Sequence, residues 1–501
     1  MHLIQNFPFF SIVLPFFCGV ACFLLGRGAA KWLSLACLAA LGAMSCILLA
    51  FTLETGESFV YRMGHFPSPF VNELSAGPLE ALMALLLCCI SLLSLSGGLG
   101  DINRDIPGNK TSFYFMMVNI LTGAMLAIIY TNDIFTAFVF IEIVTIAVCS
   151  LIMIKPGGPT LSATIVYLVF SLISSCLILF SIAMVYSITG HLLFPGIQAA
   201  LAELALTGAY TLPLFVSAAL FTTGLAVKFA LFPFHVWLPR AYVSATTASS
   251  SLMSGFVGKC FFILLIKAAY RMFGLNLMEM LRISHLLLAL GLAGIVYGSL
   301  KALGRRDTKG MLAYASIAQA GCISVAIGLN TDRAMGAVCF HIIVHGIGKA
   351  MLFTAAGGLA AVSGGRNGYD FLRGAARRDP LSGAAFIIAS LTMIGFPPFP
   401  GFFSKLYFTL AALETAFAVP AILGFVIVST LLSAMYFFPA LGSMLAREDR
   451  AEEGNVETSS PGPAPTLTYR GIMITFISLT LLLGIFSRQI LEICERGLAV
   501  F

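Results

Sequence analysis

Long apolar runs follow one another along almost the whole chain, and they constrain its fold more than any other feature. Each run is about as long as the 20 residues that a helix needs to cross a bilayer. Strands of about ten residues with alternating polarity, which would indicate a membrane β-barrel, are not found in the sequence. We expect an all-α polytopic membrane protein with about fourteen transmembrane helices, at residues 9–26, 32–52, 78–97, 113–130, 133–153, 161–187, 211–233, 245–272, 284–303, 310–328, 334–361, 382–412, 418–442 and 471–487.

The composition agrees with this class of protein. Of the 501 residues, 59% are hydrophobic and 10% are charged, and the mean hydropathy is +0.98. A soluble domain carries about 25% charged residues, so a soluble fold is excluded.

The basic residues predict the orientation in the membrane. If the loops alternate between the two sides, most of the 28 Lys and Arg fall on one side, with clusters at 301–309 and 366–378. Basic loops stay in the cytoplasm. We therefore expect a multi-pass protein of the cytoplasmic (inner) membrane with both termini outside the cytoplasm. The net charge of +6 follows from this topology, and no nucleic-acid partner is expected.

The sequence contains no pattern that would hold a redox cofactor, a metal or a nucleotide. The twelve cysteines are scattered without a CxxC pair, and neither a Walker motif nor a CxxCH haem motif is present. We expect no cofactor in this chain. Whether the protein is part of an enzyme is left open, because the energy for any work must then come from partner subunits.

Ionisable side chains inside the predicted spans are the strongest functional signal. Each costs about 2.5–3.5 kcal/mol to place at the centre of a membrane helix, so each is a functional candidate. They are Glu142, Lys228, Lys259, His341, His345, Lys349 and Lys405. One isolated lysine could be satisfied by backbone carbonyls alone, but seven such groups in one chain favour an ion pathway.

The spacing of these residues adds detail. His341, His345 and Lys349 are four residues apart, so they share one face of a helix. Glu80 and Lys267 lie near span ends, and we expect them to extend toward the membrane surface.

Two spans carry helix-breaking residues beside a buried lysine. Pro233 follows Lys228 by five residues, and the segment 395–401, with three prolines and two glycines, precedes Lys405. Broken helices at membrane depth are tolerated where they line a cavity, and transporters use them in matching positions of two inverted repeats. The breaks fall in spans 7 and 12, which fits two inverted five-helix repeats. The expected divisions are 1–110 (helices 1–3), 111–275 (helices 4–8), 276–445 (helices 9–13) and 446–501 (a cytoplasmic loop and helix 14).

Five segments carry a resemblance to a known family. "FIEIVT", "AVKFALFPFHVWLPRAYVSATTASSSLMSGFVGK", "DTKGMLAYASIAQAG", "HIIVHGIGKAMLFTAAG" and "GFPPFPGFFSKLYF" resemble the signature segments of the proton-conducting, antiporter-like membrane subunits. These occur in respiratory complex I, in Mrp-type cation/proton antiporters and in membrane-bound energy-converting hydrogenases. The resemblance covers about residues 110–410. It implies fourteen helices, two inverted repeats and broken helices 7 and 12.

The resemblance also implies roles for single residues. Glu142 corresponds to the glutamate of the fifth helix, and Lys228 and Lys259 to the lysines of the seventh and eighth helices. His345 and Lys349 correspond to the eleventh helix, and Lys405 to the basic residue of the twelfth, where one complex I subunit type carries a glutamate instead. His235 and His341 are secondary candidates, and His345 is expected to matter more than His341.

The chain departs from the family pattern at two positions. Tyr242 and Thr246 stand where the family usually has His and Pro, which leaves a histidine relay on the cytoplasmic side without support.

The expected function is proton, or cation/proton, translocation along this Glu/Lys/His chain. The expected partners are other membrane subunits of one complex and the lipid bilayer, and sodium ions remain open as an alternative to protons. Two other interpretations also remain open: an autonomous secondary transporter for a small solute, and an inactive structural subunit.

Overall fold

The computed structural model describes residues 2–63, 72–207, 210–447 and 466–500. Within these ranges, thirteen helical segments are long and apolar enough to cross a membrane. In chain order they are α2 (Phe7–Leu24), α3 (Arg27–Thr55), α4 (Pro78–Gly97), η2 with α6 (Gly108–Lys110, Thr111–Tyr130), α7 (Ile134–Met153), α8 (Gly158–Thr189), α10 (Thr211–Lys228), α12 with η3, α13 and η4 (Thr247–Leu252, Met253–Val257, Gly258–Ala268, Ala269–Phe273), α15 (Ile283–Leu303), α16 (Thr308–Gly328), α17 (Asp332–Ala361), α21 with η5 and α22 (Ala418–Ala421, Ile422–Val428, Ser429–Leu445) and α23 (Leu467–Ile485).

A further crossing is interrupted. α19 (Pro380–Ile394) and α20 (Pro400–Ala412) are each short, and together they fall within the predicted span 382–412. Counted as one, this pair raises the crossings in the described residues to fourteen. The predicted all-α polytopic fold is confirmed, and each predicted span coincides with one of these segments.

Both predicted helix breaks are present. α10 ends at Lys228, and its crossing continues as α11 (Trp237–Ser244). Between them the backbone of Ala230 is left-handed, with φ 57°, and a cis bond precedes Pro233. The break between α19 and α20 begins at Gly395, which has φ 87°, a conformation that favours glycine. The predicted repeat boundaries at 110, 275 and 445 stay predictions.

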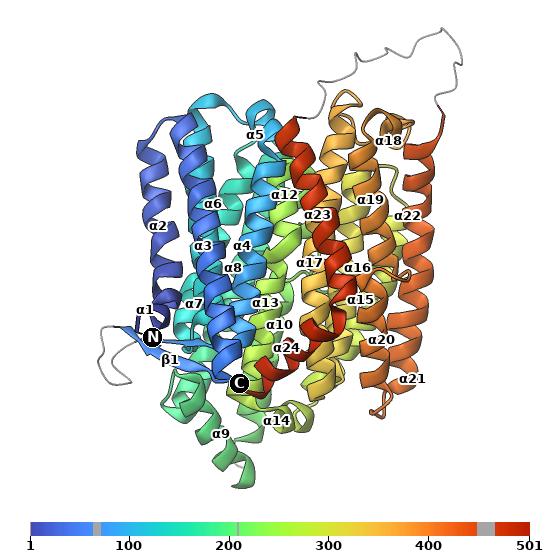
Figure 1. The fold of residues 1–501 in the computed structure, drawn as a ribbon. Helices are drawn as coiled ribbons and strands as arrows, with labels where there is room; N and C mark the ends of the chain where they lie inside the picture. Colours follow the sequence, from blue (N-terminus) through green and yellow to red (C-terminus); the bar gives the residue numbers. More distant parts are fainter. Residues whose placement is uncertain (1, 64–71, 208–209, 448–465, 501) are drawn as a thin grey trace.

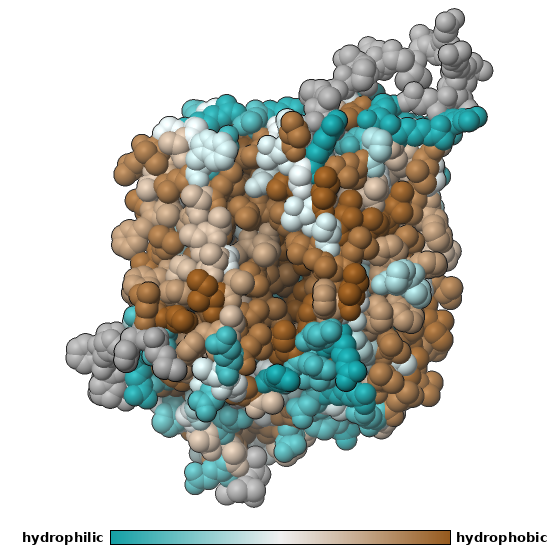
Figure 2. Space-filling model, in the orientation of Figure 1, coloured by the Kyte–Doolittle hydropathy of each residue, from teal (hydrophilic) through white to brown (hydrophobic). Residues whose placement is uncertain are grey.

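The helices form one bundle with an apolar belt. Figure 2 shows brown, hydrophobic side chains across the middle of the face in view and teal, hydrophilic ones at both ends of that face. Both chain termini lie at one end, which we call the terminal end, together with α9 (Phe194–Thr207) and α14 (Leu275–Met280) (Figure 1). The opposite end carries α5 (Leu99–Asp105) and α18 (Ala375–Arg378), and we call it the basic end. α17 lies at the centre of the bundle, packed against α4, α12, α16, α19, α20 and α23.

Short elements outside the spans were not predicted. β1 (Phe59–Arg62) pairs antiparallel with β2 (Glu73–Ala76), with Phe59 opposite Ala76. α1 (His2–Gln5) precedes the first crossing, and α24 (Ser487–Ala499) follows the last. Most of the predicted cytoplasmic loop after residue 446 lies outside the described residues.

The prediction for Glu80 and Lys267 is wrong. Both side chains are buried, at 1% and 0% exposure, and they form an ion pair of 3.6 Å. Arg271 approaches the same carboxylate oxygen at 3.5 Å. Lys267 also donates to the carbonyls of Ile129 and Thr131, at the end of α6. The Glu80 carboxylate neutralises the Lys267 ammonium in the interior, so Lys267 has no need to reach the membrane surface. The two residues lie on helices that are far apart in the sequence.

This charge cluster is expected to stabilise the bundle. Glu80→Gln would leave the charges of Lys267 and Arg271 buried without a carboxylate, which costs about 3–5 kcal/mol. We expect a clearly lower thermal unfolding midpoint for the purified protein, followed by intrinsic fluorescence. The exposed Glu54 supplies the control, since Glu54→Gln should melt with the wild type. Equal midpoints for the two variants would contradict this role.

Candidate functional site

The α10 break holds the Lys228 ammonium among polar groups from α7 and α8. Its Nζ donates to Thr145 Oγ1 at 2.8 Å and to Ser175 Oγ at 3.4 Å, and it lies 3.8 Å from Glu142 Oε1. The hydroxyl of Ser175 donates in turn to Glu142. On the far side of the break, Trp237 Nε1 donates to Val227 O at 2.9 Å and so holds α11 against the end of α10.

Glu142 reaches this pair from an outer face of the bundle. Its side chain is 31% exposed, whereas that of Lys228 is 1% exposed. Val139 and Ile146 lie three residues before and four residues after it on α7, hence on the same helix face, and both are exposed. The pair therefore joins a buried lysine to a carboxylate at the edge of an apolar surface.

A small cavity brings three of the predicted residues together. It has a volume of about 20 Å³, and Lys228, Lys259 and His345 line it together with Ser316. A polar cavity of about 10–15 Å³ already accommodates one water. Neither ring nitrogen of His345 has a hydrogen-bond partner among the described residues. A single water in this cavity would therefore have three titratable neighbours.

Two serines link Lys259 to Lys349. Lys259, at the start of α13, donates from Nζ to the backbone carbonyl of Ser254. Ser254 lies in the preceding segment η3, which has π-helical geometry. Such turns are common at functional sites. The hydroxyls of Ser254 and Ser316 are 3.4 Å apart, and Ser316 donates to Leu312 O at 3.0 Å. Lys349 Nζ donates to that same carbonyl at 2.9 Å. The two lysines thus stand at the two ends of one short polar chain.

The predicted histidine face of α17 is confirmed as a geometric feature. The rings of His341 and His345 stack with centroids 5.9 Å apart and an interplanar angle of 12°. His341 has partners on both sides: Nδ1 lies 2.6 Å from Ser404 Oγ, and Nε2 lies 3.2 Å from Gln319 Oε1. Ser404 precedes Lys405 in α20, so His341 connects the centre of the bundle to the second break.

Lys405 occupies the second break as Lys228 occupies the first. Its Nζ donates to Ile394 O at 2.9 Å, to Thr430 Oγ1 at 2.6 Å and to Ser429 Oγ at 3.2 Å. The lysine therefore satisfies a carbonyl at the end of α19 that the break leaves without a helical partner. A Cβ at Gly395 would lie 2.9 Å from the Lys405 side chain, so glycine makes room for the lysine there.

His235 lies apart from the other candidates. It lines a cavity of about 540 Å³ at the basic end, together with Arg240, Tyr297, Arg305 and other residues. Its ring stacks on Phe232 and contacts Tyr297. The structure does not bring His235 into the set formed by Glu142, the buried lysines and the α17 histidines.

The hydroxyl groups that connect the charged side chains were not predicted. They are Ser175, Ser254, Ser316, Ser404, Ser429 and Thr430, with Thr145 noted only as a neighbour of Glu142. Serine and threonine are common in membrane helices, so their presence alone carries little signal. Position could have singled out only Ser404, which directly precedes Lys405.

The contacts of His341 lead to a prediction. Because His341 touches both Gln319 and Ser404, we expect His341→Ala to slow proton transfer several-fold, as His345→Ala should. A neutral imidazole can accept on one nitrogen and donate from the other, which alanine cannot do. Stopped-flow pH measurements on vesicles with the assembled complex would show this. His285→Ala, outside the site on α15, is the control. A His341→Ala variant that equals the control would remove His341 from the pathway.

Comparisons with known proteins agree with the resemblance seen in the sequence. The family described as "NADH:quinone oxidoreductase/Mrp antiporter, TM" matches residues 131–433. The chain is 32% identical over 441 residues to an NADH-quinone oxidoreductase subunit of Desulforudis audaxviator (strain MP104C), covering 86% of this chain and 85% of the relative. It is 30% identical over 441 residues to a Na(+)/H(+) antiporter subunit of Alkalihalophilus pseudofirmus (strain ATCC BAA-2126 / JCM 17055 / OF4), covering 87% of this chain and 86% of the relative.

A solved structure has the same fold. A chain of the Mrp complex from Dietzia sp. DQ12-45-1b superposes with a TM-score of 0.87 at 22% identity, covering 100% of this chain and 97% of that chain. The matched family segment includes both helix breaks and the whole Glu/Lys/His set. This protein therefore belongs to the NADH:quinone oxidoreductase/Mrp antiporter family of membrane subunits.

Proposed function

We propose that this chain is the proton-translocating subunit of a multi-subunit membrane complex. The observation that carries the proposal is the buried series of titratable groups that joins one helix break to the other. It runs from the Glu142–Lys228 pair, through the cavity shared with Lys259 and His345, to His341, Ser404 and Lys405. In this proposal both termini lie outside the cytoplasm, and the basic end faces the cytoplasm.

The Glu142–Lys228 pair acts as the switch. At 3.8 Å the carboxylate stabilises the charged ammonium, and the low dielectric around the pair makes this attraction strong. If Glu142 moves away, the isolated ammonium is costly in the membrane and tends to release its proton. Because the helix is interrupted after Lys228, the end of α10 is not held by a continuous helix. A small movement there can therefore alter the distance between Lys228 and Glu142.

The proton then passes along the series. Hydroxyls and neutral imidazoles can each accept a proton and donate another, so they can relay without holding a charge. Lys228, Lys259 and His345 share the small cavity, and His341 connects to Ser404 beside Lys405. Lys405 releases the proton toward the terminal end. Sodium/proton exchange through the same site is the second candidate, because one relative is named as part of a Na(+)/H(+) antiporter.

Partner subunits supply the driving force. Glu142 lies at the edge of an apolar face, and a carboxylate that faces lipid there would be unfavourable. A neighbouring subunit packed against α7 would cover the Glu142 carboxylate, and a movement of that subunit would move the carboxylate relative to Lys228. Relatives of this chain are named as subunits of an NADH-quinone oxidoreductase and of a Na(+)/H(+) antiporter, which supports a role within a complex.

The proposal is tested by reconstitution. The complex purified with this chain is placed in vesicles with an internal pH dye and energised by its own donor or by an imposed sodium gradient. We expect proton movement in the whole complex and none in vesicles with this chain alone. Proton movement only with sodium present would indicate sodium/proton exchange. Solute uptake by the chain alone would instead indicate an autonomous transporter, and an inert complex would contradict proton translocation.

A further inference from the structure

The basic end contains a cavity that lies away from the Glu142–Lys228 pair. It has a volume of about 550 Å³ and lies among α4, α5, α17 and α23, where Lys31, Asp101 and Arg104 are part of its lining. Thr354 of α17 also lines it. Thr354 lies seven positions before the helix end at Ala361, so the cavity reaches about 10 Å along α17 into the bundle.

Thr354 is bonded to hydroxyls that do not line the cavity. Its Oγ1 lies 3.0 Å from Ser251 Oγ, and Ser251 Oγ lies 2.8 Å from Ser94 Oγ. Both serines are fully buried, and Ser251 also lies 3.0 Å from Ala350 O. Thr354 is itself 1% exposed, and its hydroxyl also lies 2.8 Å from Ala350 O. The cavity wall thus leads, through Thr354, into a buried hydroxyl cluster.

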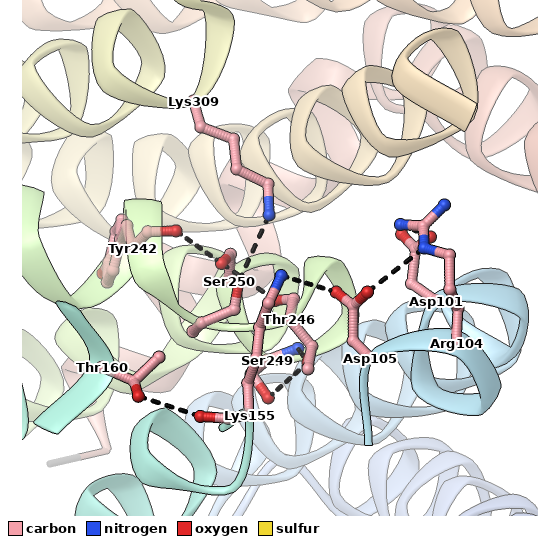
Figure 3. Close-up of polar contacts among 11 residues, drawn as sticks. Asp101, Arg104, Asp105, Lys155, Thr160, Tyr242, Thr246, Ser249, Ser250 and Lys309 are labelled. Carbon is pink, nitrogen blue, oxygen red and sulfur yellow. Dashed lines mark hydrogen bonds and ion pairs between the residues drawn. The ribbon is translucent and has the colours of Figure 1, made fainter. Parts of the chain in front are cut away.

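Ser251 belongs to a longer row of hydroxyl side chains at the start of the eighth crossing. The row comprises Thr246, Thr247, Ser249, Ser250, Ser251 and Ser254, all buried. Figure 3 shows its first members beneath Lys309, beside the ion pairs of Asp101 with Arg104 and Asp105 with Lys155. Burial alone would raise the pKa of Asp105, but the nearby Lys155 and Arg104 lower it below its usual value, so a negative charge stays at this end.

The inner end of the row reaches the central lysines. Ser254 follows Ser251 by three residues, and residues at that spacing are neighbours on a helix surface. Ser254 is also part of the link between Lys259 and Lys349 described above. Thr354 and Ser251 thus lie at the cavity end of the row, and Ser254 with Ser316 lies at the lysine end, one helical turn further along. Lys228 is not on this path.

We propose that this hydroxyl row is a second proton-uptake route, which loads Lys259 and Lys349 from the basic end without passing through Lys228. Each hydroxyl accepts a proton on its oxygen and donates its own hydrogen onward. The Ser251 hydroxyl turns from Ala350 O toward Ser254 to make the step between them, and Ser254 passes the proton to Ser316. A water in the small cavity that Ser316 shares with Lys259 carries the proton to the lysine amine. The inference rests on the proposed proton translocation. The hydroxyls act as positioning and relay groups. The alternative role for small side chains here is close packing of α12 on α17, and packing alone does not require that the hydroxyls lead to a cavity.

Removal of the hydroxyl at the mouth is the first test. Thr354→Val keeps the shape of the side chain, and Thr354→Ser keeps the hydroxyl. In vesicles with the assembled complex, we expect Thr354→Val to slow proton uptake several-fold, increasingly as the cytoplasmic-side pH is raised and protons become scarce. Thr354→Ser should restore the rate. Thr122→Val, in a buried site on α6, is the matched control. A merely structural role would lower the rate equally at every pH.

Blocking the cavity is the second test. Gly100 lines it, and a Cβ there would meet no atom within 4 Å, so Gly100→Cys should be tolerated. A charged, membrane-impermeant thiol reagent added to the basic end should then slow uptake in Gly100→Cys. Gly26 also has open space around its Cα and does not line the cavity, so Gly26→Cys is the control. It shows how much of the effect comes from the reagent's reaction with the wild-type cysteines or with a new cysteine elsewhere.

The outcomes separate this inference from the proposed function. Loss of rate in Thr354→Val and in the blocked Gly100→Cys, with both controls normal, supports the second route. A wild-type rate in both at every pH would overturn the route while the proton translocation of the complex stands. A wild-type complex that moves no protons would overturn the proposed function, and the route with it.

Discussion

Lys228→Ala is expected to abolish proton translocation by the assembled complex, and Glu142→Gln to lower it to a similar extent. Lys228 is buried, and its ammonium is held by Thr145, Ser175 and the Glu142 carboxylate, so alanine removes the group that carries the proton. Glutamine keeps the size of Glu142 but not its charge. Loss of a proton-transfer group slows such steps by about a hundredfold or more.

The measurement is proton movement into vesicles with each variant complex, after its assembly is checked by size-exclusion chromatography. Lys301→Ala and Glu54→Gln change exposed residues of the same types and should behave as the wild type. Translocation by Lys228→Ala or Glu142→Gln at the wild-type rate would show that the pair is structural only.

A second large effect is expected at the other break. Lys405→Ala should block proton release, whereas Lys405→Glu should keep part of the activity. The position needs a titratable group, and the hydroxyls of Ser429 and Thr430 that now accept from the ammonium can donate to a carboxylate instead. The activity should be partial, because an ionised glutamate cannot donate to Ile394 O and leaves the end of α19 without that partner.

Proton release is followed with a pH dye on the side of the terminal end. Arg282→Ala, a basic residue outside the site, serves as the control. Equal and complete loss in Lys405→Ala and Lys405→Glu would mean that the positive charge itself, or its bond to Ile394, is what the position supplies.

Most of the fold could be predicted because the membrane imposes a simple rule. Spans such as 78–97 are apolar over the full thickness of the bilayer, and α4 covers the same residues. The breaks were visible in the prolines after Lys228 and before Lys405. The hairpin of β1 and β2 was missed, since two four-residue strands in a loop leave no periodic signal.

The site was predictable where burial is costly and unpredictable where it depends on pairing. Lys259 and Lys349 were found because an ammonium inside a span is expensive. The opposite expectation for Lys267 failed, because its partner Glu80 lies 187 positions earlier in the chain and no local pattern links them. Ser254 and Ser316 were missed for the same reason, since each gains its role only when α16 packs beside the eighth crossing.

The central claim is that Lys228 must release its proton in each cycle, and Lys228→Arg tests it most directly. A guanidinium keeps the positive charge and can still pair with Glu142, but it stays protonated in proteins. Proton movement is measured in vesicles with the Lys228→Arg complex, with assembly confirmed on the same preparation. We predict that Lys228→Arg assembles and fails to translocate protons, as Lys228→Ala does. Translocation at the wild-type rate would contradict the account, because the charge alone would then be sufficient.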